Sequence, residues 1–395
     1  MAEVWLLELL YGLGRFFLNP AFYILLLFAW LIGIQRTKKE RKDFSVRIFP
    51  FNSEIVECIL YGLISGVCVS IVLLGLGIVI PVGFIALTSV LTILVLLIMQ
   101  PRLLSPAYVI GGAMLISLFV PNITVENQLL ANWMTELEES PLFMMAVLLS
   151  LMLLAEGFLI VRKGHLQTSP ALKKSKRGKQ IGVHEAKKLW LVPVLLFIPG
   201  DALSSTLPWW PVIKTPFANF ALLAVPFGIG FHQFIQASLP KEAIQLAGRR
   251  VLLLAIFVTI LTVASYWLPI LAVAASVVAI IGRELIALKQ KVADMGSAPY
   301  FSNNKGLVIL GIIPDSPADK MGLKVGEIIT KVNGIQVKTA KQFYEALHVN
   351  RAFCKLDVLD YNGEVRFVQR ALYENEHHEL GLLFVNDEND WALTK

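Results

Sequence analysis

The stretch that decides the fold of the C-terminal region is GIIPDSPADKMGLKVGEIITKVNGIQV, residues 311–337. Ser316 is a good helix N-cap, Pro317 suits the first helical position, and Gly322 can supply the left-handed residue that ends the helix. Asn333-Gly334 is typical of a type I′ turn between two hairpin strands. The stretch therefore predicts a small α+β domain that folds in water.

The flanking residues extend this domain to about 305–386. Thr339 followed by Gln342 forms a capping box, which predicts a helix over 340–349. A second hairpin is expected around Asn362-Gly363. Apolar runs bounded by turn residues predict strands at 306–313, 325–332, 355–359, 365–368 and, as the final strand, 378–385.

The block SPADKMGL-KVGEIITKVNG resembles PDZ domains of the bacterial type. The resemblance implies a permuted fold in which the carboxylate-binding loop and groove strand come last in the chain. PDZ domains bind an extended peptide by strand addition, between an edge strand and a helix. We therefore expect a peptide groove; a blocked groove that serves as a docking surface or spacer is the alternative. The expected groove residues are Leu380, Gly381, Leu382, Leu383 and Phe384 on the strand side, with Phe343 and Leu347 on the helix.

Most of the remaining sequence suits lipid rather than water. Of the 395 residues, 56% are hydrophobic and 16% are charged, whereas soluble domains carry about 25% charged residues. A helix of about 20 apolar residues crosses a bilayer. Nine segments meet this pattern approximately: 20–35, 55–80, 82–100, 104–120, 141–161, 189–207, 217–236, 250–267 and 269–288.

The weakest of the nine is 189–207, because Pro193, Pro199, Gly200 and Asp201 interrupt it, and a re-entrant turn is an alternative there. The predicted fold class is mainly α. A polytopic helical membrane domain of about nine spans covers 20–290, and a small α+β PDZ domain with a short acidic tail covers 295–395.

Lysine and arginine alternate between the connecting loops. Loop 35–54 carries six of them and loop 162–188 carries nine, whereas 121–140 has glutamates and neither Lys nor Arg. Basic loops stay on the cytoplasmic side, so the same alternation predicts a cytoplasmic domain at 295–395. The residues of loop 162–188 expected to face lipid headgroups, unless they serve as topology signals alone, are Lys173, Lys174, Lys176, Arg177 and Lys179.

Residues 1–19 are expected to form an amphipathic helix in the membrane interface. Glu8, Gly12, Arg15 and Asn19 make one polar stripe among leucines and phenylalanines. The N-terminus lies outside if 20–35 is a full span, and inside if 3–35 is a hairpin.

The sequence offers little catalytic chemistry. A membrane zinc protease needs HExxH on an apolar helix, and the nearest stretch, His184-Glu185-Ala186-Lys187-Lys188, lacks the second histidine. We expect no enzyme, no cofactor or metal, and no nucleic-acid partner. A transporter is an alternative, because ionisable groups in lipid mark transport pathways. Its candidate residues are Glu156, Asp201, His232, Arg283 and Glu284.

The architecture and the N-terminal runs GRFFLNPAFYILL (14–26) and QRTKKERKDF (35–44) resemble the MinJ family of Gram-positive rod-shaped bacteria. The resemblance implies a membrane adaptor in division-site selection, enriched at septa and poles. It would link a pole-marking DivIVA-type protein to the division inhibitor MinD, and through MinD to MinC. Membrane lipids and a second copy of the chain are further expected partners. The alternatives are a PDZ-bearing transporter or a regulatory subunit of a membrane protease.

Overall fold

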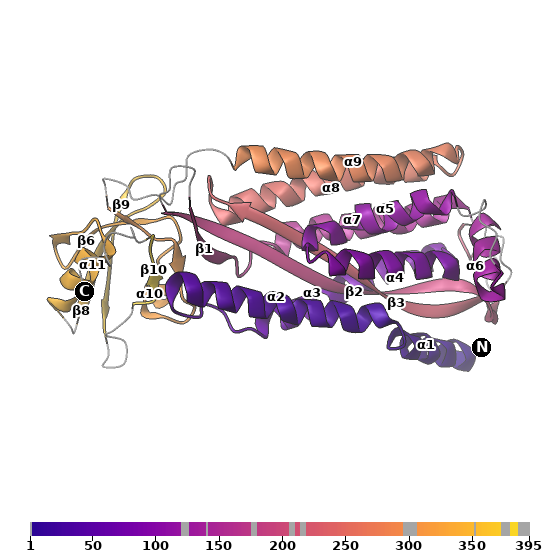
Figure 1. Cartoon of the computed structure of the whole chain (residues 1–395), viewed down its shortest axis with the longest axis horizontal. Helices are drawn as coiled ribbons and strands as arrows, with labels where there is room; N and C mark the ends of the chain where they lie inside the picture. Colours follow the sequence, from indigo (N-terminus) through magenta and orange to yellow (C-terminus); the bar gives the residue numbers. More distant parts are fainter. Residues whose placement is uncertain are drawn as a thin grey trace.

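The computed structural model is elongated, with a helical domain that encloses a long β-hairpin and a small α+β domain at one end (Figure 1). The mainly α class and the small C-terminal α+β domain are confirmed. The residues that the structure describes are 2–119, 126–139, 141–174, 180–204, 210–213, 219–294, 306–350, 353–372 and 380–385.

Within the described residues, five helices are long and apolar enough to cross a membrane: α2 (Pro20–Phe44), α3 (Ser53–Leu76), α7 (Leu142–Lys163), α8 (Pro240–Ala264) and α9 (Ile270–Ala293). Two shorter apolar helices, α4 (Val82–Leu97) and α5 (Pro106–Ser117), lie roughly parallel to these five. These seven occupy seven of the nine predicted segments. The remaining helical elements are α1 (Ala2–Phe16), the 3-10 turn η1 (Pro101–Leu104) and α6 (Gln128–Glu139).

The prediction of helices at 189–207 and 217–236 is wrong. These segments form strands β2 (Gln180–Ser204) and β3 (Asn219–Ile235), which pair antiparallel, and β1 (Ser169–Lys174) pairs with the start of β2. The reason is local: a proline inside a helix costs about 3 kcal/mol. Segment 189–207 contains Pro193 and Pro199, and segment 217–236 contains Pro226. In the hairpin, Pro193 lies directly opposite Pro226, so the two residues without N–H groups share one position of the ladder.

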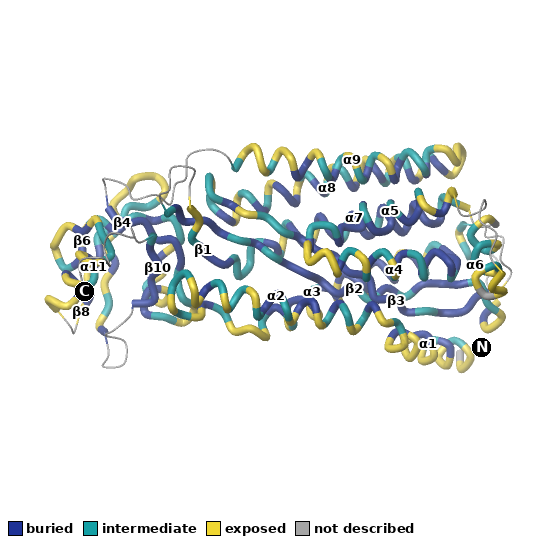
Figure 2. Tube along the Cα trace, in the orientation of Figure 1, coloured by how far each residue is buried: buried dark blue, intermediate teal, exposed yellow. Residues whose placement is uncertain are grey.

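The hairpin runs between the helices and is buried along most of its length (Figure 2). An open sheet edge cannot face lipid, because its N–H and C=O groups would lack partners. The α3 helix covers the β2 edge: Ser70 Oγ accepts a hydrogen bond from Leu195 N at 2.8 Å. Glycines of α3 allow this approach, since a Cβ at Gly62 would lie 1.9 Å from Leu191 O.

The α1 helix covers part of the β3 edge with its predicted polar stripe. Glu8 Oε1 accepts from Leu222 N at 3.2 Å, and Arg15 Nη1 donates to Leu222 O at 3.3 Å. The opposite face of α1 leaves its leucines exposed, including Leu6 and Leu10. A helix that presents leucines outward at the end of a membrane domain suits the interface.

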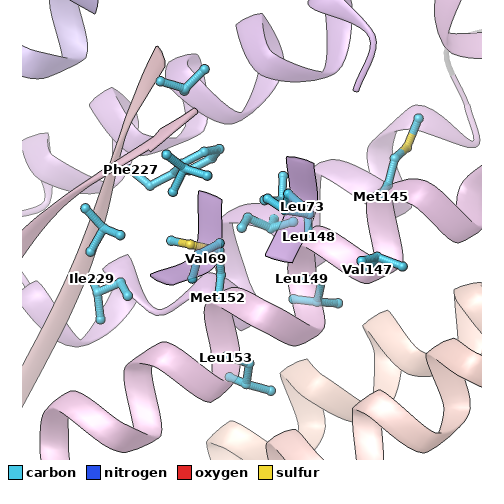
Figure 3. Packing of buried hydrophobic residues seen from close by; sticks show 14 of the residues in the cluster. Val69, Leu73, Met145, Val147, Leu148, Leu149, Met152, Leu153, Phe227 and Ile229 are labelled. Carbon is cyan, nitrogen blue, oxygen red and sulfur yellow. The ribbon is translucent and has the colours of Figure 1, made fainter. Parts of the chain in front are cut away.

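Helix α7 forms the centre of the helical domain (Figure 3). Leu148, Leu149 and Met152 are at most 1% exposed. Together with Val69 of α3 and Phe227 of β3 they belong to one continuous cluster of buried apolar side chains. The hairpin is therefore part of the core and contributes to it as a helix pair would.

The two ends of the molecule differ in charge. The α6 helix and the N-terminal α1 lie at the end far from the C-terminal domain (Figure 1). The C-terminal end of α2, with its basic residues, lies at the same end as β1 and the C-terminal domain. The hairpin returns to the end from which it starts, so replacing two helices by two strands leaves the predicted alternation of loops unchanged.

The C-terminal domain follows the predicted order of elements. Its helices are α10 (Pro317–Lys320) and α11 (Ala340–His348). Its strands are β4 (Leu307–Val308), β5 (Gly311–Ile312), β6 (Ile328–Val332), β7 (Ile335–Gln336), β8 (Phe353–Leu359), β9 (Val365–Ala371) and β10 (Leu382–Leu383). Strands β4, β6, β8 and β9 form one sheet with β7 on β6, and β10 pairs with β5.

Local signals in this domain are confirmed in detail. The Ser316 side chain accepts from Asp319 N, and Gly322 has φ +68°. Asn333 and Gly334 both have positive φ, as a type I′ turn requires. The final predicted strand, 378–385, is present as β10; residues 378 and 379 lie outside the described residues.

Candidate functional site

Strand β10, the predicted groove strand, belongs to a two-stranded sheet with β5. It pairs with β5 on one edge: Leu310 N donates to Leu383 O, and Ile313 N donates to Gly381 O, both at 2.8 Å. Among the described strands, β5 is the one that pairs with β10. Gly381, in the loop before β10, has φ +79°, and a Cβ there would lie 2.3 Å from Ser316 Cβ. Only glycine fits this loop without strain.

Helix α11 forms the facing wall. Thr339 Oγ1 accepts from Gln342 N at 3.3 Å, and Gln342 Oε1 accepts from Lys338 N at 2.9 Å, so the capping-box signal fixes where the helix starts. The Phe343 ring packs against the Phe384 ring with centroids 5.1 Å apart. This contact sets the spacing between helix and strand.

Phe343 and Leu347 lie beneath the groove rather than in it. They are 0% and 2% exposed and belong to the core of the C-terminal domain. The α11 residues that line the cavity are Ala340 and Tyr344. Ala340 and Tyr344 are four residues apart, so they lie on one face of the helix, next to the face that carries Phe343 and Leu347. This spacing is the sequence signal that could have identified them. On the strand side, Leu382, Leu383 and Phe384 line the cavity, whereas Leu380 does not. Leu380, Leu382 and Phe384 all belong to the core of the C-terminal domain.

A cavity of about 560 Å³ lies at this groove, and two domains share its wall. In addition to the C-terminal domain, the end of α2 and strands β1 and β2 of the membrane domain line this cavity. The contributing residues are Lys42, Asp43, Phe44, Ser45, Leu172, Lys173, Lys174 and Gln180. This second wall was not predicted from the sequence. Lys173 and Lys174, expected at lipid headgroups, line the cavity; Lys176, Arg177 and Lys179 lie outside the described residues.

A hydrogen bond joins the C-terminal domain to the membrane domain next to this cavity. His184 Nε2 donates to Leu310 O at 2.8 Å. Gly182 permits the approach, because a Cβ there would lie 2.6 Å from Leu310 Cδ1. His184 lies outside the predicted spans, and burial lowers its pKa to about 4. The ring is therefore neutral at pH 7, which suits a single N–H donated to a carbonyl oxygen.

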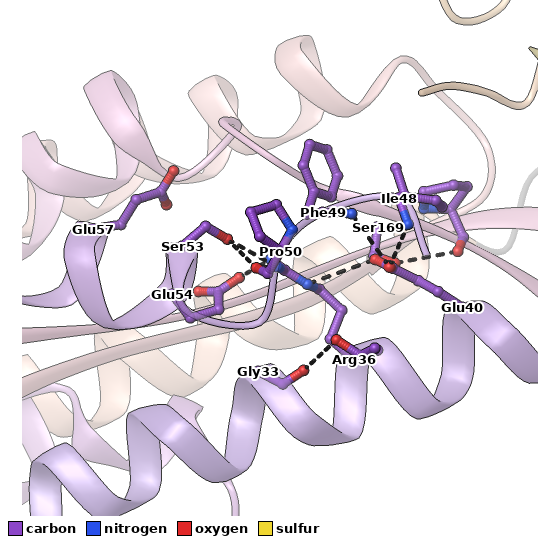
Figure 4. Close-up of polar contacts among 12 residues, drawn as sticks. Gly33, Arg36, Glu40, Ile48, Phe49, Pro50, Ser53, Glu54, Glu57 and Ser169 are labelled. Atoms are coloured by element: carbon purple, nitrogen blue, oxygen red, sulfur yellow. Dashed lines mark hydrogen bonds and ion pairs between the residues drawn. The ribbon is translucent and has the colours of Figure 1, made fainter. Parts of the chain in front are cut away.

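A polar network holds the membrane-domain wall in place (Figure 4). Arg36 of α2 pairs with Glu54 of α3 and, at 3.6 Å, with Glu40 of its own helix. Glu40, which is 0% exposed, accepts from Ile48 N and from Ser169 Oγ, both at 2.9 Å. The end of α2 and the start of β1 are thereby fixed to each other.

A further contact ties the two segments of this wall together. Asp43 Oδ2 accepts from Leu172 N at 3.0 Å. Phe44 and Leu172 also pack with Leu310 and Val385 in a small cluster that spans both domains. The cavity wall is thus built from ordered elements on both sides.

Four of the five ionisable groups considered for transport have partners within the described structure. Arg283 Nε donates to Glu156 Oε1 at 3.0 Å, and both side chains are at most 1% exposed. Arg102 pairs with Glu284, and His232 Nε2 lies 3.0 Å from Glu185 Oε1. Asp201 is exposed. Among the described residues, no group of three or more His, Cys, Asp or Glu side chains is arranged to hold a metal ion.

Comparisons with known proteins identify the C-terminal domain and relatives of the whole chain. The family model described as PDZ domain matches residues 308–356. The chain is 42% identical to "Cell division topological determinant MinJ" of Bacillus subtilis (strain 168), over 99% of this chain and 98% of that protein. It is 24% identical to "Probable cell division topological determinant MinJ" of Lacticaseibacillus paracasei, over 94% of this chain and 97% of that protein.

Proposed function

Because the chain belongs to the MinJ family of cell-division topological determinants, we propose that it is a membrane adaptor whose PDZ groove recruits a division protein to the site of septation. In this proposal it links a pole-marking DivIVA-type protein to MinD and MinC, and it concentrates at septa and poles. The observation that carries the proposal is the cavity between β10 and α11, beside a strand edge that can accept an incoming strand.

The charge distribution supports a cytoplasmic groove. The basic loops and the C-terminal domain occupy the same end of the molecule, and α6 with its glutamates occupies the other. By the positive-inside rule, the end that carries the basic loops faces the cytoplasm. A groove on the cytoplasmic side of the membrane is accessible to cytoplasmic division proteins.

Cysteine labelling tests this orientation. In a variant whose native cysteines are replaced, Asn132→Cys on α6 and Lys338→Cys before α11 each place one exposed thiol at opposite ends. We expect an impermeant maleimide to label Asn132→Cys in intact cells, and Lys338→Cys only after lysis. Labelling of Lys338→Cys in intact cells would contradict the cytoplasmic adaptor.

Blocking the groove tests its use. Ala340→Trp places an indole in the cavity, whereas Glu345→Trp places it on the exposed face of the same helix, away from the cavity wall. A micromolar contact is worth about −8 kcal/mol, and excluding the peptide from the groove removes it. We expect Ala340→Trp to lower capture of DivIVA-type protein or MinD at least tenfold and to misplace septa, giving minicells or filaments.

The control, Glu345→Trp, is expected to bind its partners like the wild type, and cells that carry it should place their septa normally. Both variants should melt at similar temperatures. If a well-folded Ala340→Trp protein captures its partners and places septa normally, the groove is idle. Recruitment would then run through the membrane domain.

A further inference from the structure

The groove at β10 has a wall that an isolated PDZ domain would lack. A peptide that adds to β10 lies roughly 5 Å from that strand, with Ala340 and Tyr344 of α11 beside it. In this chain the end of α2 and β1 close the cavity from the membrane-domain side. Any occupant of the groove therefore contacts both domains.

The added wall is basic. Among the described lining residues, Lys42, Lys173 and Lys174 are exposed to solvent, and Asp43 is the one carboxylate. The Asp43 carboxylate already accepts the hydrogen bond from Leu172 N. On the PDZ side the lining residues are uncharged: Ala340, Tyr344, Leu382, Leu383 and Phe384. The groove thus combines an apolar, strand-pairing side with a cationic side.

We propose that this composite groove binds an acidic, extended segment of a partner protein, whose backbone pairs with β10 and whose carboxylates meet the lysines of α2 and β1. The proposal rests on the proposed function, since it requires that the groove be used. A lipid headgroup supplies negative charge, but it supplies neither the backbone for the β10 edge nor side chains for the apolar wall. The membrane domain accordingly selects the ligand as well as anchoring the chain.

The test is selection of random decapeptides displayed on phage against the full-length protein in nanodiscs. We expect the wild type to enrich peptides of net negative charge. The variant Lys42→Glu/Lys173→Glu/Lys174→Glu should lose this enrichment and bind the best wild-type peptide about tenfold more weakly or worse. Binding to the wild type should also weaken as salt rises.

The matched control is Lys38→Glu/Arg41→Glu/Lys291→Glu, which changes net charge equally at exposed positions outside the cavity wall. It should select and bind like the wild type. If the wild type enriches peptides without acidic residues, or if the two triple variants behave alike, the acidic ligand is ruled out while the groove function stands. Failure of Ala340→Trp to reduce selection would instead overturn the groove function itself.

One more variant separates a partner from the chain's own acidic tail. A chain that ends at Val385 lacks residues 386–395, which include Asp387, Glu388 and Asp390. We expect it to bind the selected peptide as the full chain does. A tenfold or greater gain of affinity on truncation would assign the groove to the tail and overturn the partner proposal.

Discussion

Gly62→Val is expected to disrupt the membrane domain, with a loss of about 3 kcal/mol or more of stability. A Cβ at this position would lie 1.9 Å from Leu191 O and 2.5 Å from Leu191 C. The obstacle is the backbone of a buried strand, which cannot rotate away as a side chain can. To admit the valine, β2 would have to leave α3, and Leu195 N would move away from Ser70 Oγ.

Gly75→Val provides the control in the same helix. A Cβ at Gly75 has no neighbouring atom within 4 Å, and valine is a slightly better helix former than glycine. Thermal unfolding of the two variants in detergent compares them directly: Gly75→Val should melt at or slightly above the wild-type temperature, and Gly62→Val far below it. Similar melting of both variants would mean that β2 does not lie against α3.

The same hairpin marks the limit of what the sequence predicted in the membrane domain. A strand buried on both faces carries a continuous apolar run, so it lacks the alternation that identifies half-buried strands. Length and hydropathy alone then indicate a helix. The opposing signal was present in Pro193 and Pro226, and in Gly228 and Gly230, which also disfavour a helix interior. Because the whole region is so apolar, its hydropathy outweighed these residues in the prediction of secondary structure.

In the C-terminal domain, local chemistry sufficed because each signal acts over a few residues. Ser316, Gly322 and Asn333-Gly334 fix caps and turns through their own side chains and φ angles. The groove was harder to predict. The strongest apolar stripe of α11 packs into the core, so Phe343 is buried and the less apolar stripe with Ala340 and Tyr344 faces the cavity. An amphipathic pattern identifies the buried face, not the face that meets a ligand.

No local sequence pattern predicts the cavity wall that α2 and β1 form. Lys42 and Lys173 are far apart in the sequence, and they meet at the groove because Glu40 and Asp43 bind β1 through Ser169 and Leu172. The basic residues of both loops were recognised, but as topology or lipid signals. Their position beside β10 depends on how the C-terminal domain docks, through His184 and Leu310.

Arg283→Met is expected to destabilise the protein by about 3–5 kcal/mol, because it leaves a buried carboxylate without its cation. Glu156 is 0% exposed. Without Arg283 it keeps the hydrogen bond from Ser105 Oγ, at 2.6 Å, which cannot compensate a full charge. Thermal unfolding in detergent should show a large drop in melting temperature.

Two comparisons make this result specific. Arg102→Met breaks the Arg102–Glu284 pair, whose side chains are 35% and 41% exposed; such a pair is worth at most about 1 kcal/mol. The double variant Glu156→Gln/Arg283→Met removes both buried charges and should recover most of the stability lost in Arg283→Met. Recovery would show that the two charges act as a structural pair that joins α7 to α9. If the double variant were no more stable than Arg283→Met, the lost stability would come from the packing of the arginine side chain, and the charge pair would contribute little to holding the two helices together.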